Sequence, residues 1–231
     1  QMQLPSTPKA ALDVGCGLGW SLDYFAKQVK GIEIAGVEPS NYCAEHVTNV
    51  IGAELVGRDV DADWHISQVG RFDIVVMRMV AEHLLDPIGA FKKVRETLSS
   101  KGLFYIAIPN MMNPAGSLKK FWYRIVHTYY YSKTTLTRIA GLSGLEPVVV
   151  EVDGAELWGI FKRKDNFSDP NLPSVYAAQI KVLQGYKFKR FVRAGFQFFG
   201  IRMLGKLLPK AIKNRVPEGL KKKFRKAFYG H

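Results

Sequence analysis

Residues 11–20 of this chain read A-L-D-V-G-C-G-L-G-W. Apolar residues flank Asp13, and glycines then occupy the alternate positions 15, 17 and 19. The segment 21–30 that follows has helical periodicity, so the pattern predicts a buried strand, a glycine-rich turn and the start of a helix. Glycine is needed where the backbone takes a positive φ or approaches a ligand closely, and the first N–H groups of the helix point to the same place. The stretch therefore predicts a ligand-binding turn.

Two acidic residues near this turn indicate what kind of ligand it binds. The spacing G-x-G-x-G differs from the G-x-G-x-x-G of dinucleotide-binding turns, and the negative charge of Asp13 would repel a pyrophosphate. A second strand, 32–37, is expected to end at Glu38, where a carboxylate can accept hydrogen bonds from both hydroxyls of a ribose. We therefore expect a ligand with an ammonium group at one end and a nucleoside at the other. The alternative is an ordinary glycine turn of some other α/β enzyme.

The string L-D-V-G-C-G-L-G at residues 12–19 resembles the first motif of the class I S-adenosylmethionine-dependent methyltransferases. Three later strings resemble the second half of the same fold: F-D-I-V-V at 72–76, E-H-L-L-D-P at 82–87 and K-G-L-F-Y-I-A-I-P-N at 101–110. The last two are similar to a branch that methylates small molecules, ubiquinone precursors and saccharides. The resemblance spans residues 10–163. It implies an α/β fold with a Rossmann-like, doubly wound, seven-stranded, mostly parallel sheet whose last strand is antiparallel. It also implies S-adenosyl-L-methionine as the cofactor.

The resemblance assigns cofactor contacts to the ends of the first four strands. In that family an acidic side chain just past the third strand accepts the adenine amino group, and here Asp59 and Asp61 are equal candidates. Arg78, after the fourth strand, could hold an anionic acceptor or form a salt bridge. The residues expected to line the cofactor are Asp13, Gly15, Cys16, Gly17, Gly19, Trp20, Glu38, Pro39, Ser40, Asp59, Asp61, Met77 and Arg78.

The candidate catalytic residues are Glu82, His83 and His127. Methyl transfer from a sulfonium is a direct displacement, in which the protein mainly aligns the reacting atoms and excludes water. A base is needed only when the acceptor is a hydroxyl, and histidine is the usual choice near neutral pH. His83 and His127 are the candidate bases, and Glu82 could orient a histidine or the acceptor. The alternative for the two histidines is a structural role, in a helix start and in packing.

We expect no metal ion at this site. Members of the ubiquinone-type branch carry a further acid three residues before the Glu-His pair, and that position is Met79 here. Glu82 and His83 alone would make a poor magnesium or zinc site.

The remaining periodicities predict the other elements of the sheet. Pro87 opens a helix that Gly102 is expected to stop, and the aromatic-rich insertion 111–131 is expected to form a lid over the acceptor. Further helices are expected at 40–51, with Ser40 as the N-cap, and at 133–140; strands are expected at 53–60, 72–77, 103–108, 145–152 and 157–162, the last two as an antiparallel pair.

Length and charge indicate one domain with an appendage. The chain has 231 residues and a formal net charge of +13, and residues 181–231 hold 15 of the 33 lysines and arginines but only one acid, Glu218. We therefore expect a methyltransferase domain at 1–165 and a basic, mostly helical extension at 166–231 that contacts an anionic partner. Two cysteines and the lack of a long apolar stretch predict a cytoplasmic protein. The basic extension could also hold it at the inner membrane face as a peripheral protein. Since the resembled family usually carries one or two helices before the first strand, we also expect that an N-terminal part is missing.

Three functions stay open. The first is O-methylation of a small-molecule or saccharide acceptor, with the basic segment docked on anionic lipid headgroups if the acceptor is lipid-linked. The second is nucleic-acid methylation, with the same segment on phosphates; it is disfavoured because no N-P-P-Y-like segment follows the fourth strand. The third is a binding module without turnover, which should have lost cofactor residues, whereas Asp13, Gly15, Gly17 and Glu38 are all present. Oligomeric state is not predicted.

Overall fold

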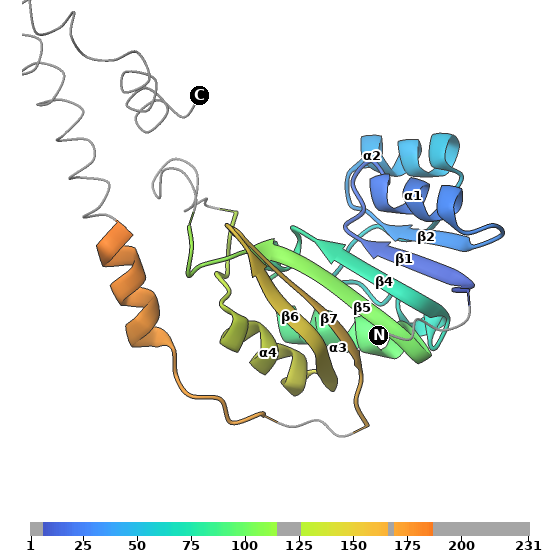
Figure 1. The fold of residues 1–231 in the computed structure, drawn as a ribbon. Helices are drawn as coiled ribbons and strands as arrows, with labels where there is room; N and C mark the ends of the chain where they lie inside the picture. Colours follow the sequence, from blue (N-terminus) through green and yellow to red (C-terminus); the bar gives the residue numbers. More distant parts are fainter. Residues whose placement is uncertain (1–6, 115–125, 166–168, 187–231) are drawn as a thin grey trace, which may run out of the picture. The chain divides into compact units, whose positions relative to one another are not determined.

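The computed structural model describes residues 7–114, 126–165 and 169–186. Strands and helices alternate along most of the chain, as the sequence predicted (Figure 1). The strands are β1 (Ala10–Val14), β2 (Glu33–Val37), β3 (Glu54–Gly57), β4 (Phe72–Arg78), β5 (Leu98–Pro109), β6 (Leu145–Asp153) and β7 (Glu156–Arg163). The helices are α1 (Trp20–Gln28), α2 (Asn41–His46), α3 (Pro87–Thr97) and α4 (Lys133–Leu142).

The seven strands form one sheet in the order β3-β2-β1-β4-β5-β7-β6. The pairs from β3 to β5 are parallel, and β7 is antiparallel to both of its neighbours. The predicted seven-stranded, mostly parallel sheet with an antiparallel last strand is therefore confirmed. From β1 the chain adds β2 and β3 on one side and then returns to β4 on the other side. In open α/β sheets such a switch point opens a ligand crevice outside the carboxyl ends of the strands.

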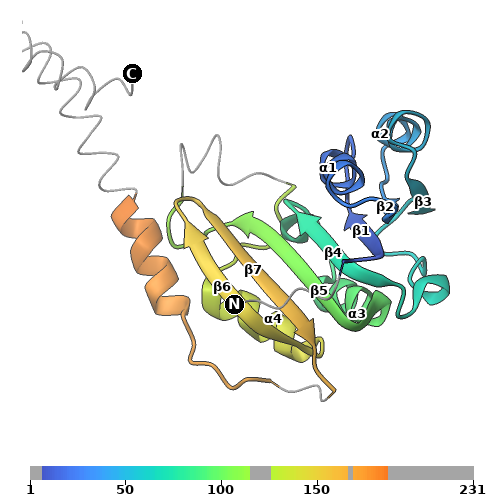
Figure 2. The same ribbon diagram turned by 45° about the vertical axis from the view of Figure 1, so that its right-hand side comes forward.

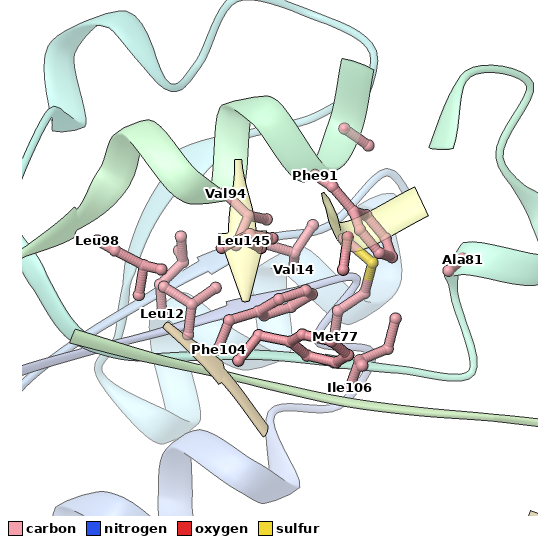
Figure 3. Close-up of a cluster of buried hydrophobic side chains, with 14 of the residues drawn as sticks. Leu12, Val14, Met77, Ala81, Phe91, Val94, Leu98, Phe104, Ile106 and Leu145 are labelled. Atoms are coloured by element: carbon pink, nitrogen blue, oxygen red, sulfur yellow. The ribbon is translucent and has the colours of Figure 1, made fainter. Parts of the chain in front are cut away.

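Helices cover both faces of the sheet. Helices α1 and α2 lie over β1 and β2, and α3 and α4 lie on the opposite face (Figures 1 and 2). The larger core lies under α3, where Phe91 and Val94 point toward the side chains of β1, β4 and β5 (Figure 3). The central strand β1 is buried along its whole length, as a parallel strand between two helical layers should be.

Local side-chain chemistry starts the helices where the sequence predicted. Ser40 caps α2 by accepting from the N–H of Cys43 at 3.4 Å, and a π-helical turn continues this helix to Ile51. Asp86 caps α3 by accepting from the N–H of Gly89 at 2.9 Å, with Pro87 as the first helical residue. Each cap satisfies a backbone N–H that has no partner inside its own helix.

Three predicted boundaries were wrong, and one of them is the start of the fifth strand, which lies at Leu98 and not at residue 103. The third strand ends at Gly57 and not at residue 60. Helix α3 ends at Thr97, well before Gly102, because Leu98 is already extended, fully buried and paired with Phe72. Gly102 lies inside β5, where an added Cβ would stand 2.7 Å from the carbonyl oxygen of Phe72. A close backbone approach, and not a helix stop, accounts for this glycine.

The chain divides into two compact units, Gln1–Gln179 and Ile180–His231. The predicted boundary after residue 165 stays a prediction, since most of the basic extension 166–231 and the central part of the insertion 111–131 lie outside the described residues. Within the ranges that the structure describes, none of the helices has the length and apolar character needed to cross a bilayer.

Candidate active site

The carboxyl ends of β1, β2 and β4 bring the predicted site residues to one edge of the sheet. Register pairs Asp13 with Gly36 of β2 and with Val76 of β4. Glu38 follows the last residue of β2, and the N–H groups of Gly15 and Cys16 both donate to Val37 O, at 2.8 and 3.2 Å. The glycine turn is therefore fastened across the end of β2, at the switch point of the sheet.

The three glycines of the turn have positive φ angles of 76°, 53° and 77° at positions 15, 17 and 19. A Cβ on Gly15 would stand 2.4 Å from the Val80 side chain, so the segment after β4 packs directly on the turn. A Cβ on Gly17 would meet no described atom within 4 Å. The turn is thus closed by protein at Gly15 and open at Gly17, as a surface for a ligand requires.

Asp13 presents a buried carboxyl group beside this turn. Asp13 is 4% exposed, and burial raises the pKa of its carboxyl from 3.8 to about 7. The nearby charge of Glu38 also raises this pKa, whereas a hydrogen bond from Ser21 lowers it. A buried carboxylate gains most from a cationic partner. An ammonium group at this place would hold Asp13 in its charged form, so the residue fits the cationic end of the expected ligand.

Glu38 holds the turn from the end of β2. Its Oε2 accepts from the N–H of Gly17 and its Oε1 from the N–H of Ser40, both at 2.8 Å. The carboxylate is buried and is fixed by these two bonds, while each oxygen keeps a second lone pair for a further donor. This geometry fits the predicted contact with a ribose diol.

The other residues predicted around the turn differ in what they can offer. Cys16 is buried, and burial raises the pKa of its thiol to about 12, so it is a neutral thiol at physiological pH. Gly19 is the residue before α1, and Trp20, the first residue of that helix, is 78% exposed. Met77 is fully buried, with its side chain in the core under α3 (Figure 3). Only the backbone of Met77 can therefore face a ligand.

The other predicted cofactor residues are exposed. They are Asp59, Asp61 and Arg78, together with Pro39 and Ser40 at the start of α2. Asp59 Oδ1 accepts from the N–H of Asp61 at 2.9 Å, so Asp59 supports a local turn. Arg78 forms an ion pair with Glu156 of β7 at 2.9 Å. Besides a cofactor contact, the sequence left two roles open for Arg78, namely binding an anionic acceptor or forming a salt bridge. In the structure Arg78 forms the salt bridge.

The three predicted catalytic side chains lie together. Glu82 and His83 belong to a 3₁₀ turn, η3 (Ala81–His83), that follows β4, and His127 comes from the insertion. The rings of His83 and His127 are 4.8 Å apart at 72°, and Glu82 Oε1 lies 4.0 Å from His83 Nε2. One ligand atom from each of the three lies within 4.8 Å of the others. We call these three residues the Glu-His-His cluster.

The proton positions in this cluster follow from its backbone contacts. His83 Nδ1 lies 2.9 Å from the carbonyl oxygen of Val126. A carbonyl oxygen can only accept, so Nδ1 carries the proton and a neutral His83 has its lone pair on Nε2. Glu82 is 2% exposed, and burial raises the pKa of its carboxyl, although its backbone hydrogen bond and the nearby His83 lower it. Its Oε2 has no hydrogen-bond partner among the described residues.

The end of the insertion is bound to η3 by backbone hydrogen bonds. The N–H groups of Thr128 and Tyr129 both donate to the carbonyl oxygen of Glu82, at 2.7 and 3.2 Å. The hydroxyl of Tyr131, a residue 1% exposed, donates to the carbonyl oxygen of Ala81 at 3.0 Å. These bonds explain why a histidine that is 44 positions away in the chain lies against His83.

Sequence reasoning did not predict that Met79 and Val80 join this cluster to the glycine turn. Met79 takes a left-handed conformation, with φ of 55°, and its N–H donates to Ala107 O at 2.8 Å. A positive φ is uncommon for methionine and marks a sharp turn at the strand end. This turn places Val80 against Gly15, and η3 follows directly along the chain. No sequence signal marks Met79, because its conformation depends on the neighbouring strand β5.

A family model described as "Methyltransferase domain" matches residues 2–150. Among curated proteins no match was found.

Many solved structures share the fold. An S-adenosylmethionine-dependent methyltransferase from Mesorhizobium loti superimposes with a TM-score of 0.58 at 16% identity, covering 69% of this chain and 94% of that one. A TehB-like SAM-dependent methyltransferase from Corynebacterium glutamicum gives 0.54 at 21% identity, covering 69% and 82%. A SAM-dependent methyltransferase from Thermotoga maritima, described as a possible histamine N-methyltransferase, gives 0.56 at 19% identity, covering 70% and 84%. At these identities the likeness concerns the fold.

Proposed function

This chain belongs to the class I S-adenosylmethionine-dependent methyltransferases, and we propose that it methylates a hydroxyl group of a small-molecule or saccharide acceptor. The observation that carries the proposal is the Glu-His-His cluster, which lies just beyond the residue that packs on the glycine turn. A hydroxyl must lose a proton to become a good nucleophile, and this cluster offers groups that can take it.

The cofactor is S-adenosyl-L-methionine, whose sulfonium supplies an activated methyl group. We assign its ammonium group to Asp13 and its ribose hydroxyls to Glu38, because these are the buried carboxylates beside the turn. Gly17 gives the cofactor room at the turn. Asp59 and Asp61 are equal candidates for the adenine amino group, since the backbone bond that Asp59 Oδ1 accepts leaves further lone pairs on its carboxylate.

The other residues predicted for the cofactor, which lie in the glycine turn and after the end of β2, have supporting roles in this proposal. Cys16, Gly19 and Trp20 shape the turn and the start of α1, and Pro39 and Ser40 lie beside the ribose. The Arg78 guanidinium is held by Glu156, so it has no assigned contact with the cofactor.

His83 is the residue that we assign to proton removal. Its Nε2 carries the lone pair, because Val126 O holds the proton on Nδ1. Its side chain is 39% exposed and can therefore meet an acceptor, whereas Glu82 is covered. In this proposal Glu82 orients His83, and His127 lines the space for the acceptor. Holding the acceptor oxygen, methyl carbon and sulfur in line can lower the barrier by up to about 7–11 kcal/mol in favourable cases.

The test is a screen of methyl acceptors that follows release of S-adenosylhomocysteine. Phenols, sugar hydroxyls and amines should be compared, and turnover is expected with hydroxyl acceptors. His83→Ala is expected to lower turnover by about 10²–10⁴-fold while cofactor affinity stays within about twofold. His65→Ala is the matched control, since His65 also lies beside a glutamate, Glu96 at 3.4 Å, but away from the cluster. Turnover with amines alone, or full activity of the His83 variant, would overturn the proposal.

A further inference from the structure

We propose that Glu82, His83 and His127 together bind one divalent transition-metal ion of the zinc class. The sequence offers Glu82 and His83 side by side and therefore only two ligands. The fold adds a third, because the insertion returns to η3 and places His127 against His83.

The donor set selects the kind of metal. Two imidazole nitrogens and one carboxylate oxygen are the protein ligands of several catalytic zinc sites, which keep a fourth position open. Imidazole suits Zn²⁺, Fe²⁺ and related ions, whereas Mg²⁺ and Ca²⁺ prefer oxygen ligands. The cluster is buried at Glu82, intermediate at His127 and exposed at His83. It is thus closed on one side and open on the other, which leaves a position for the acceptor.

Two of the three side chains, His83 and Glu82, have contacts that are typical of metal ligands. In metal sites a histidine usually donates its second ring N–H to a backbone carbonyl or carboxylate, which fixes the tautomer and aims the other nitrogen at the metal. His83 has this arrangement, with Nδ1 on Val126 O at 2.9 Å and Nε2 facing Glu82 Oε1 at 4.0 Å. Glu82 has a buried oxygen, Oε2, for which no partner exists among the described residues. A cation would provide that partner.

The distances require a small contraction. Bonds of about 2.0–2.2 Å place neighbouring ligands of a tetrahedral ion about 3.4 Å apart. The three ligand atoms lie within 4.8 Å of one another, so the most distant pair must approach by up to about 1.4 Å. Small rotations of the three side chains can supply this movement without moving the backbone of η3, where the carbonyl oxygen of Glu82 is held by the N–H groups of Thr128 and Tyr129.

A bound metal would also change how the acceptor loses its proton. This part of the inference rests on the proposed function. The ion would lower the pKa of a hydroxyl acceptor in the open position, so that its proton could pass to solvent. The acceptor oxygen would then form the bond to the methyl carbon as the carbon–sulfur bond breaks, which leaves a neutral thioether. His83 would then act as a ligand and not as the base.

The experiment uses the full chain stripped with a chelator and dialysed free of it. Zn²⁺ binding is measured by calorimetry, and the coordination geometry is read from the visible absorption of bound Co²⁺. We expect one ion per chain, with affinity reduced at least about 10–100-fold in Glu82→Gln, His83→Ala and His127→Ala. His65→Ala and Cys43→Ser are the controls, because they remove a histidine and a thiol outside the cluster, and they should bind Zn²⁺ normally.

The outcomes separate this inference from the proposed function. Binding that is lost in the three cluster variants and kept in both controls would support the site. Weak binding of several ions, or binding unchanged in the cluster variants, would overturn it, and hydroxyl methylation by the stripped protein would then leave the proposed function intact. One bound ion together with full activity after stripping would support the site and overturn its role in proton removal. Circular dichroism of each variant shows whether a loss of binding reflects a loss of fold.

Discussion

Replacing Asp13 with asparagine should make the cofactor-free protein more stable and at the same time weaken cofactor binding. The reason is that Asp13 is a buried carboxyl beside the glycine turn, with Ser21 as a hydrogen-bond donor and Glu38 as a nearby negative charge. In the free protein its charge has little compensation, whereas an ammonium group would compensate it fully. Stability and binding should therefore change in opposite directions.

The magnitude follows from the pKa. Burial raises the pKa of Asp13 from 3.8 to about 7, so the folded chain binds this proton more tightly than the unfolded chain does. The stability that Asp13 contributes is full below about pH 4 and is lost as the pH rises through about 7. The shift of roughly three units corresponds to about 4 kcal/mol. Asparagine has no charge to ionise, so the advantage of Asp13→Asn over the wild type should grow by about 3 kcal/mol between about pH 5 and about pH 8.

The assay is urea unfolding of both proteins over this pH range without cofactor, followed by calorimetric titration with S-adenosylmethionine at the upper end. Affinity should fall about 10–100-fold, since a hydrogen bond to a charged group contributes about 1.5–3 kcal/mol. The control is Asp23→Asn on α1, whose carboxylate pairs with Lys27 at the surface at 2.6 Å and should change stability by less than about 0.5 kcal/mol. A pH-independent loss of stability in Asp13→Asn would refute the argument from burial. Unchanged affinity would refute the assignment of the ammonium group.

Three further predictions concern the turn and the basic segment. Gly15→Ala, which meets Val80 at 2.4 Å, should lower the free energy of unfolding by about 1–3 kcal/mol through the clash alone. Gly17→Ala meets no described atom within 4 Å but has a positive φ, so it should lower the free energy of unfolding by only about 1–2 kcal/mol and should also weaken cofactor binding. Thermal unfolding and calorimetry compare the two variants. Glu38→Gln leaves one of two backbone N–H groups without its acceptor and should cost about 1–3 kcal/mol of stability, measured by urea unfolding, as well as cofactor affinity; an unchanged midpoint would contradict this. Deletion of residues 181–231 should abolish sedimentation with anionic liposomes and leave cofactor binding unchanged. If the intact chain does not bind liposomes but binds RNA tightly and in a salt-sensitive way, a nucleic-acid substrate would be favoured instead.

Much of the fold could be predicted because short-range rules govern it. The alternation around β1, the cap at Ser40 and the proline at position 87 each act within a few residues, and each appears in the structure where the sequence indicated. Gly102 shows the limit of such rules. Its role depends on the carbonyl of Phe72, which lies 30 positions earlier in the chain and meets it only when β4 and β5 pair.

The sequence by itself determined the sheet, the order of its helices and the pair of acids at the first two strand ends, because periodicity and turn chemistry are properties of neighbouring residues. Only the tertiary structure decided which distant segments meet around these strand ends. Val80 reaches Gly15 because Met79 turns left-handed against β5, and Arg78 is held by Glu156 from a strand that enters the sheet last. His127 joins Glu82 and His83 because backbone hydrogen bonds return the insertion to η3. Contacts of this kind depend on how distant segments pack, and a local pattern of residues carries no record of them.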